Sequence, residues 1–522
     1  MSEWSDFEKY FFRADDLGIS IDFSKIGFSD EFFSAMEYKI STAYREMAAL
    51  EAGAVANRDE YRMVGHYWLR NADIAPSEGI REQISETIEK VVRFAEKVHM
   101  GHIVGQDGRF ENALFIGIGG SALGPQLICE SLGKNVKLGC YFIDNTDPDG
   151  VDITLGKLAG KLGKTLVVVT SKSGSTPEPR NAMVEVAAAY EKGGYAFPRH
   201  AVAVTGENGL LDRQAIAEGW IDRFAMWEWV GGRTSVFSAV GLLPAALQGN
   251  SLKFFISGAR RMDELTRSVS PKNPAMMMAL AWFLAADGVG KKDMVVIPYK
   301  DRLSSFSKYL QQIVMESVGK EKDRDGNIAR QGLTVYGNKG SSDQHSFVQQ
   351  LRDGLRNFFV TIISVLRARD GGSILVDSDG MTSGDYLNGF AVGTMRALCE
   401  NGTRVIHLSI DELSERELGA LIALYERSVG FYCSMVNINA YNQPGVEAGK
   451  KAAANVLKIQ RSIVSFLEKS RGRVVTIDDI SSGAQVQSKV LAFKIVEHIA
   501  ANGRFIKRFR GDGGFAATYE VA

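Results

Sequence analysis

Short apolar, β-branched runs alternate with segments of helical character along most of this 522-residue chain, and this alternation limits the possible folds more than any other feature. One series occupies residues 101–270, and a second begins after about residue 290. Strands joined through helices run parallel in one sheet, because the crossover returns the chain to the end where the first strand began. We therefore predict an α/β protein with two domains, residues 101–270 and 271–454, each a mainly parallel sheet flanked by helices.

The two ends of the chain differ from this pattern. Residues 1–100 carry apolar side chains at helical spacing, which predicts a helical N-terminal region packed on the core. Residues 455–522 read as helix, short strand, two helices and a hairpin with its turn at residues 511–514, a succession that resembles a winged helix. From residue 451 onward, 12 Lys and Arg face 6 Asp and Glu, a net charge of +6. Because most basic faces are solvated surface, we expect a structural or interface role for this small α+β module and no nucleic-acid partner.

The overall composition is that of a globular protein, with 45% hydrophobic and 24% charged residues and a net charge of −1. The near-zero charge gives no argument for binding nucleic acid or an anionic membrane. The four cysteines (129, 140, 399 and 433) have no CxxC spacing, which favours a reducing compartment. The N-terminus lacks the apolar core of a signal peptide, and the apolar run 275–286 is too short to span a bilayer. We expect a cytoplasmic protein. Without an HxH or HExxH spacing, no metal site is indicated.

The loop TSKSGSTPEP, residues 170–179, lies between a predicted buried strand and a predicted helix. Four hydroxyls and one ammonium group fall on six consecutive positions there: Ser171, Lys172, Ser173, Ser175 and Thr176. Thr176 is placed to cap the helix, and Pro177 fits its first turn. Hydroxyls and free N–H groups at a helix N-terminus suit a phosphate monoester. An ordinary serine-rich turn that caps a helix is the alternative.

A second glycine-rich turn, GIGGSALGP at residues 117–125, also joins a predicted strand to a helix. Gly117, Gly119 and Ala122 fit GxGxxA, and Asp144 ends the next strand, as in a dinucleotide-binding unit. Alternatively, Gly120 and its neighbours let a sugar phosphate approach the backbone beside the hydroxyl loop. The two interpretations predict different ligands.

Two further segments contain side chains suited to chemistry. Arg233 stands between glycines and a helix start in GGRTS, where its guanidinium could point into a cleft or form a structural ion pair. In the predicted helix 306–320, Gln312 and Glu316 stand one turn apart beside a buried stripe. A carboxylate beside apolar side chains suits acid–base work, although most helix glutamates are merely solvated.

Polar side chains also cluster in two later segments. His345 occupies a polar turn in GSSDQHSFVQQL, and it has the most site-like surroundings of the seven histidines. Gln443 and Lys450 flank a helix start in YNQPGVEAGK. Taken singly, these residues read as a surface histidine, a loop and an exposed lysine.

Six segments together carry a resemblance to a known family. In chain order they are GIGGSALGP, SKSGST, GGRTS, QQIVMESVGK, SDQHSFVQQL and YNQPGVEAGK. In this order and at these separations, they closely resemble the phosphoglucose isomerase family over roughly residues 60–455. The family has two sugar-isomerase domains, each a parallel sheet wrapped by helices. Thr234 departs from the family's usual aromatic residue after GGR, and SSDQH lacks its usual Gly-Thr opening.

The resemblance implies reversible conversion of glucose 6-phosphate and fructose 6-phosphate through a cis-enediol, in glycolysis and gluconeogenesis. Glu316 would move the proton between C2 and C1, and Arg233 would stabilise the charge of the intermediate. His345 and Lys450 would open the sugar ring, with His345 donated by the other subunit of a homodimer. The implied substrate-binding residues are Gly120, Ser121, Ser171, Lys172, Ser173, Thr176, Gln312 and Gln443. No cofactor is implied, because proton transfer between adjacent carbons needs no redox partner.

Three other functions stay open on the sequence. The first is an isomerase that also accepts mannose 6-phosphate. The second is an NAD-dependent dehydrogenase, which rests on GxGxxA and Asp144. The third is a non-catalytic sugar-phosphate sensor, which would not need Glu316, His345 and Lys450.

Overall fold

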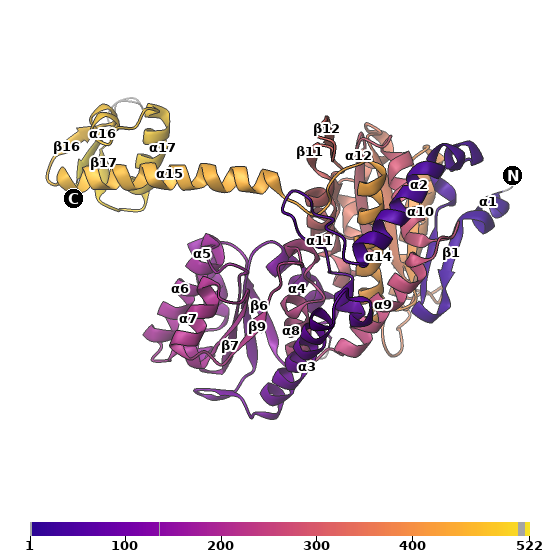
Figure 1. Ribbon diagram of the computed structural model, residues 1–522, viewed down its shortest axis with the longest axis horizontal. Coiled ribbons are helices and arrows are strands. Elements are labelled where there is room, and N and C mark those ends of the chain that lie inside the picture. The colour runs from indigo at the N-terminus through magenta and orange to yellow at the C-terminus, as the bar shows by residue number, and fades with distance from the viewer. Residues whose placement is uncertain (1–2, 135, 510–516, 522) are drawn as a thin grey trace. The chain divides into compact units, whose positions relative to one another are not determined.

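The computed structural model describes residues 3–134, 136–509 and 517–521, and it divides the chain into two compact units, residues 1–442 and 443–522 (Figure 1). The larger unit contains two parallel sheets. The first has the strand order β6-β5-β7-β8-β9, with every pair parallel. Its strands are β5 (Asn112–Ile116), β6 (Gly139–Ile143), β7 (Thr165–Thr170), β8 (Ala201–Thr205) and β9 (Asp222–Ala225).

Alternate side chains of the first sheet enter two different cores, as a pleated strand requires. Leu114 and Val167 pack with α5, α6 and α7 on one face, whereas Phe115 and Val168 face α3, α4 and α8 on the other. The helices are α3 (Glu78–Met100), α4 (Gly120–Ser131), α5 (Pro148–Lys157), α6 (Pro177–Lys192), α7 (Leu210–Glu218), α8 (Ala239–Gln248) and α9 (Leu252–Arg267). Covering helices on both faces explain why β5, β7 and β8 are buried along their whole length and largely apolar.

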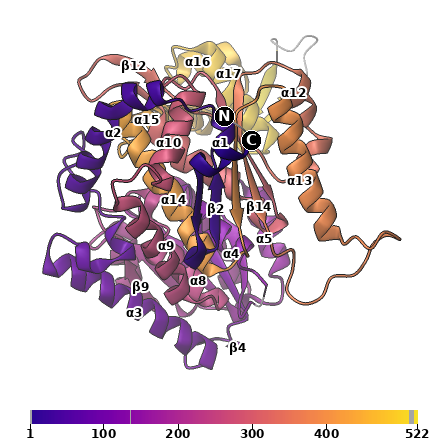
Figure 2. The ribbon, with the colours of Figure 1, turned by 90° about the vertical axis from the view of Figure 1, so that its right-hand side faces the viewer.

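The second sheet has the order β1-β2-β15-β14-β10-β13. β10, β13, β14 and β15 pair in parallel, and β2 adds antiparallel to β15 (Figure 2). The strands are β1 (Phe11–Ala14), β2 (Ile19–Asp22), β10 (Asp293–Tyr299), β13 (Val335–Tyr336), β14 (Phe358–Val365) and β15 (Val405–Ile410). Its helices are α10 (Pro274–Ala285), α11 (Phe306–Leu310), α12 (Val348–Asp353), α13 (Ser383–Glu400) and α14 (Glu415–Met435). The predicted α/β class with two mainly parallel sheets is confirmed.

The N-terminal region is not wholly helical, contrary to the sequence prediction. Besides α1 (Glu3–Tyr10), α2 (Asp30–Glu51) and α3, it contains the hairpin of β1 and β2. Gly18, with φ +57°, closes the turn, and Ile19 and Ile21 of β2 are fully buried. Such short strands are stabilised by pairing with β15, a distant segment that local spacing cannot reveal.

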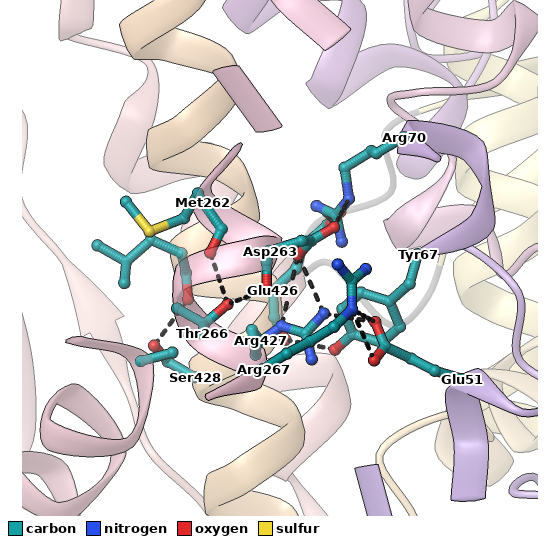
Figure 3. Close-up of polar contacts among 12 residues, drawn as sticks. Glu51, Tyr67, Arg70, Met262, Asp263, Thr266, Arg267, Glu426, Arg427 and Ser428 are labelled. Carbon is teal, nitrogen blue, oxygen red and sulfur yellow. Dashed lines mark hydrogen bonds and ion pairs between the residues drawn. The ribbon is translucent and has the colours of Figure 1, made fainter. Parts of the chain in front are cut away.

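A buried ionic cluster joins α2, the turn Trp68–Arg70, α9 and α14 (Figure 3). Three guanidinium groups meet three carboxylates: Arg70, Arg267, Arg427, Glu51, Asp263 and Glu426. Arg70 lies 2.8 Å from Asp263 and 2.7 Å from Glu426, all with side chains at most 1% exposed. Because each charge has a partner, the cluster can stay buried between helices that support both sheets.

The second unit contains α15 (Pro444–Lys469), β16 (Val474–Thr476), α16 (Ile477–Gly483), α17 (Lys489–Ala501), β17 (Ile506–Phe509) and β18 (Thr518–Val521). Its sheet is antiparallel, in the order β16-β18-β17. The element order is the one predicted for the small α+β module. The turn predicted at residues 511–514 lies outside the described residues. α15 crosses the boundary predicted after residue 454, and the unit begins at residue 443.

Two short antiparallel pairs complete the larger unit: β3 (Val104–Gly105) with β4 (Gly108–Arg109), and β11 (Lys320–Lys322) with β12 (Ile328–Gln331). Within the described ranges, no helix combines the length and apolar character that crossing a membrane requires.

Candidate active site

The loops after β5 and β7 lie at the point where the first sheet reverses its strand order. β5 and β7 are neighbours, but the chain visits β6 on the far side of β5 between them. The following helices therefore cover opposite faces, α4 with one core and α6 with the other. Open α/β sheets bind ligands in the crevice at such a switch point, outside the carboxyl ends of the strands. Both predicted glycine-rich turns therefore lie at one crevice.

The hydroxyl loop is shaped by its own side chains. Ser171 is buried, and its Oγ accepts a hydrogen bond of 3.2 Å from the backbone N–H of Gly174. Gly174 has φ +72°, and a Cβ there would lie 2.3 Å from the backbone nitrogen of Leu211. Ser173 and Ser175 are exposed, with their hydroxyls 2.8 Å apart. Thr176 occupies the N-cap position of α6, but within the described part of the chain its side chain makes no capping bond, contrary to the sequence prediction. The Thr176 hydroxyl is therefore not committed to the helix.

Lys172 joins the hydroxyl loop to the segment that precedes Arg233. Its Nζ lies 3.3 Å from the backbone oxygen of Glu228, 3.4 Å from that of Val230, and 3.4 Å from the Glu228 carboxylate. Burial lowers the pKa of the Lys172 ammonium, and Glu228 opposes this effect. A positive charge thus stands at the base of the loop.

Gly119 and Gly120 let three distant segments meet. A Cβ on Gly120 would lie 2.0 Å from the backbone oxygen of Gly232, and one on Gly119 would lie 3.1 Å from Nε2 of Gln312. Gly120 and Ser121 are the first residues of α4. Close packing against the Arg233 segment therefore requires Gly120, whereas Gly119 is required by its φ of +56°.

Asp144, on which the dinucleotide interpretation depended, is held by other side chains. Its Oδ2 accepts a 2.9 Å hydrogen bond from Gln126 and lies 4.0 Å from Nζ of Lys308. These contacts give the carboxylate a structural role in this chain.

Arg233 and Glu316 form the charged centre of the site. Arg233 is 6% exposed, and its Nη1 lies 3.3 Å from Oε1 of Glu316. Nε donates to Oγ of Ser317 at 2.9 Å, and Nη2 donates to the backbone oxygens of Ala440 and Asn442 at 2.9 and 2.8 Å. Burial lowers the pKa of Arg233, which Glu316 partly offsets. Four contacts thus hold the Arg233 guanidinium in place.

The second carboxylate oxygen of Glu316 has a different environment. Oε2 is buried, and among the described residues it has no hydrogen-bond partner. A buried acceptor without a partner carries a free-energy cost that a bound donor would relieve. Such an atom is suited to receive a proton from a bound substrate.

The helix that carries Glu316 is irregular. α11 continues as a π-helical turn, Gln311–Glu316, whereas the sequence predicts one regular helix. Its buried stripe is nevertheless the predicted one: Phe306, Leu310, Ile313 and Val314. A single π turn keeps the apolar face and rotates the residues that follow, so local periodicity does not reveal it.

Lys320 lies beside Glu316 and was not among the residues predicted for the site. It is 6% exposed, and its Nζ donates to the backbone oxygens of Glu316 at 2.6 Å and Ser317 at 2.8 Å. Burial, with the charge of Arg233 as the next cause, lowers the pKa of Lys320 to about 8. The residue lies in the polar run GKEK, which resembles a surface turn. Two features of the sequence pointed to it: its spacing of four from Glu316 and its place at the end of the segment QQIVMESVGK.

The structure does not bring every predicted residue to this centre. His345 is exposed in the turn Ser342–His345, which Asp343 organises by accepting hydrogen bonds from Asn338 at 2.9 and 3.1 Å. Across the described residues, no hydrogen bond or ion pair joins His345 to Glu316. Gln443 and Lys450 belong to the second unit, at the start of α15. Also among the described residues, no group of three or more His, Cys, Asp or Glu side chains is placed to hold a metal ion.

Comparison with known proteins agrees with this arrangement. Residues 22–394 and 399–470 match the family model of phosphoglucose isomerase. The glucose-6-phosphate isomerase of Geotalea daltonii is 53% identical over 504 residues, which cover 96% of this chain and 95% of that protein. The chloroplastic glucose-6-phosphate isomerase 1 of Arabidopsis thaliana is 50% identical over 513 residues, covering 96% of this chain and 84% of that protein.

Solved structures show the same fold. The crystal structure of a glucose-6-phosphate isomerase from Chlamydia trachomatis superposes with a TM-score of 0.77 at 26% identity, covering 87% of this chain and 91% of that one. A hypothetical protein from Thermus thermophilus gives a TM-score of 0.71 at 28% identity, covering 84% and 99%. The matched segments contain the glycine-rich turns, Arg233 and Glu316 described above. The chain therefore belongs to the phosphoglucose isomerase family.

Proposed function

We propose that this chain catalyses the reversible isomerisation of glucose 6-phosphate and fructose 6-phosphate. The observation that carries the proposal is the Arg233–Glu316 pair at the switch-point crevice, with Oε2 of Glu316 buried and without a partner. The names of the relatives favour this activity over the wider mannose 6-phosphate activity and over a non-catalytic sensor.

The geometry supports a specific role for each residue of the centre. Oε2 of Glu316 takes the proton from C2 of the open-chain aldose and returns it to C1, while the proton of the C2 hydroxyl passes to the oxygen on C1, which gives the ketose. Arg233 stabilises the enediolate oxygen, since a guanidinium remains charged at neutral pH and gives up no proton. Lys320 holds the backbone oxygens of Glu316 and Ser317 and adds a second positive charge near the reacting carbons.

The substrate phosphate is assigned to the hydroxyl loop. Ser173 and Thr176 supply hydroxyls, Ser171 shapes the loop, and the N-terminus of α6 adds free N–H groups. Lys172 supplies charge at the base of the loop. Gly120, Ser121 and Gln312 then line the sugar, next to Arg233.

Ring opening is assigned to His345 and Lys450, and a sugar-hydroxyl contact to Gln443. The exposure of His345 and its lack of a contact to Glu316 within the described chain support donation of this histidine to the site of a second subunit. We therefore include a homodimer with shared sites in the proposal. The proposal also includes a cytoplasmic location. The four free cysteines support this location, because thiols stay reduced in the cytosol.

A direct assay tests the activity. The purified full chain is mixed with fructose 6-phosphate alone, without nucleotide or added metal, and ³¹P NMR follows the phosphomonoester signals. We expect glucose 6-phosphate to accumulate until the two sugars reach equilibrium. Unchanged fructose 6-phosphate, under conditions in which the chain is shown to be folded, would exclude the proposal.

A further inference from the structure

The second sheet contains a switch point of the same kind as the first. β10 lies between β13 and β14, and the chain passes from β10 to β13 before it returns to β14. The helix after β10, α11, packs in one core, and the helix after β14, α13, packs in the other. The loops that follow β10 and β14 therefore flank a second crevice at the carboxyl ends of parallel strands. Among the residues that the structure describes, none from the candidate active site lines the hollow at this crevice.

A hollow of about 270 Å³ opens at this crevice, and positive charge dominates its lining. The five cations in the lining are Lys134, Lys300, Arg302, Arg367 and Arg369. The three carboxylates are Asp370, Glu412 and Glu415. Five positive charges against three negative ones leave an excess of +2.

Among the residues that the structure describes, two of the five cations have a carboxylate partner. Lys134 pairs with Asp370 at 2.5 Å, and Arg367 pairs with Glu412 at 2.6 Å. Glu415 accepts a hydrogen bond of 3.1 Å from the backbone of Ser251. The carboxylates of the lining therefore leave part of its positive charge unneutralised.

Within the described ranges, the other three cations form no ion pair. Half-buried Lys300 donates to the backbone oxygen of Ala368 at 2.5 Å, and half-buried Arg302 donates to those of Ser131 and Leu413 at 2.6 and 3.1 Å. Carbonyl groups orient these side chains but do not cancel their charge. Arg369 is exposed and, among the described residues, has no hydrogen bond or ion pair.

Two further observations indicate that the excess positive charge in the hollow carries a free-energy cost. Burial lowers the pKa of Lys300, and the charges of Arg302 and Lys134 act in the same direction. The N-terminus of the 21-residue helix α14 also lies here, since Leu413, Ser414 and Glu415 line the hollow. Its dipole adds positive potential. A bound anion would relieve both effects.

We propose that this hollow is a second, separate binding site for a small polyanion, a compound that carries one or more phosphate groups. Its position connects it to the candidate active site through one helix. α4 begins at Gly120 and ends at Ser131, whose hydroxyl donates to the backbone oxygen of Arg302 at 2.9 Å. The loop after β10 also leads directly into α11 and Glu316. Occupancy is therefore expected to change the KM for sugar phosphate by a few fold.

Calorimetric titration of the full chain with inorganic pyrophosphate tests the proposal. We expect two sites per chain, one in the hydroxyl loop and one in the hollow. Arg369→Glu should remove the second site, or weaken it at least tenfold, and leave the first. The matched control Lys291→Glu, at an exposed lysine outside the hollow, should keep both. A loop variant, Ser173→Ala with Thr176→Val, should weaken the first site and keep the second.

The possible outcomes distinguish failure of the second-site proposal from failure of the phosphate assignment in the hydroxyl loop. A single site that persists in Arg369→Glu and weakens in the loop variant would exclude the hollow and support the hydroxyl loop. A single site that Arg369→Glu removes would support the hollow and contradict the phosphate assignment in the loop. Equal losses in Arg369→Glu and Lys291→Glu would mean that only general surface charge attracts pyrophosphate, and would overturn the proposal.

Discussion

The guanidinium of Arg233 lies 3.3 Å from the carboxylate of Glu316, although the two residues come from opposite halves of the larger unit. Arg233 follows the first sheet, and Glu316 ends the π turn beyond β10. Their side chains are only 5% and 18% exposed, so their interaction is weakly screened by water. This pair therefore links the two sheets at the place where we assign the proton transfer.

Lys320 should govern the alkaline side of the pH–rate profile. With a pKa of about 8, it is charged below that pH and neutral above it, so kcat/KM should fall as pH rises through this range. Lys320→Met should lower kcat at pH 7 by about tenfold, a loss of about 1.4 kcal/mol, because the charge beside Glu316 is gone. Lys320→Arg keeps the charge at all these pH values and should abolish the alkaline fall.

Steady-state kinetics between pH 6 and 10 provide the measurement. Exposed Lys322, two residues along the same strand, offers a matched control, and Lys322→Met should behave as the unmodified chain does. An alkaline fall that persists unchanged in Lys320→Arg would remove Lys320 from this role.

The hydroxyl of Thr176 should contribute directly to phosphate binding. Thr176→Val keeps the shape at the N-cap and removes the hydroxyl, which makes no capping bond in the described chain. One hydrogen bond to a charged group is worth about 1.5–3 kcal/mol, so the inhibition constant of sorbitol 6-phosphate should rise by about tenfold or more. Unphosphorylated sorbitol serves as the control ligand. A variant that binds sorbitol 6-phosphate normally would place the phosphate elsewhere.

Arg427 should be essential to the buried ionic cluster of Figure 3. It lies 2.6 Å from Glu51 and 3.1 Å from Asp263, and its side chain is fully buried. Arg427→Met leaves both carboxylates short of a partner, which should cost about 3–5 kcal/mol of unfolding free energy. Arg260→Met breaks an exposed 3.8 Å pair with Asp73 and should cost less than about 1 kcal/mol. Urea unfolding compares the two, and equal losses would contradict the importance of the cluster.

The architecture was predictable because it rests on strong local signals. The buried runs of β5, β7 and β8, and the helices between them, follow directly from apolar patterning. The β1–β2 hairpin and the π turn at Gln311–Glu316 depend on distant pairing and on one altered turn, which local patterns do not encode.

The candidate site could be proposed from the sequence for a different reason. Arg233, Glu316 and the two glycine-rich turns stand in motifs that resemble a family, whereas each residue alone had an ordinary interpretation. Lys320 ends the segment QQIVMESVGK, but the resemblance assigned it no role, and only the folded chain shows that its ammonium is buried under the backbone of Glu316.

A shared site should reveal itself by complementation. His345→Ala and Glu316→Gln are each expected to be inactive, but a mixed dimer has one site with both lesions and one with neither. If subunits exchange at random, about half of the dimers are mixed, and activity should recover to about a quarter of the unmodified level. Native mass spectrometry verifies the exchange. A mixture that exchanges and stays inactive would place His345 in its own chain's site or outside catalysis.

The central claim, that Glu316 carries the proton between C1 and C2, is tested most directly by isomerisation in D₂O. The unmodified chain should convert fructose 6-phosphate to glucose 6-phosphate, with deuterium at C2 in those turnovers in which the proton on Glu316 exchanges with solvent before it is returned, and NMR detects this label. Glu316→Gln keeps the shape of the side chain but cannot accept the proton, so conversion and deuterium incorporation should both fall by about a hundredfold or more. Glu321→Gln, at an exposed neighbour, should change neither. A Glu316→Gln chain that still isomerises and incorporates deuterium at the unmodified rate would contradict the account.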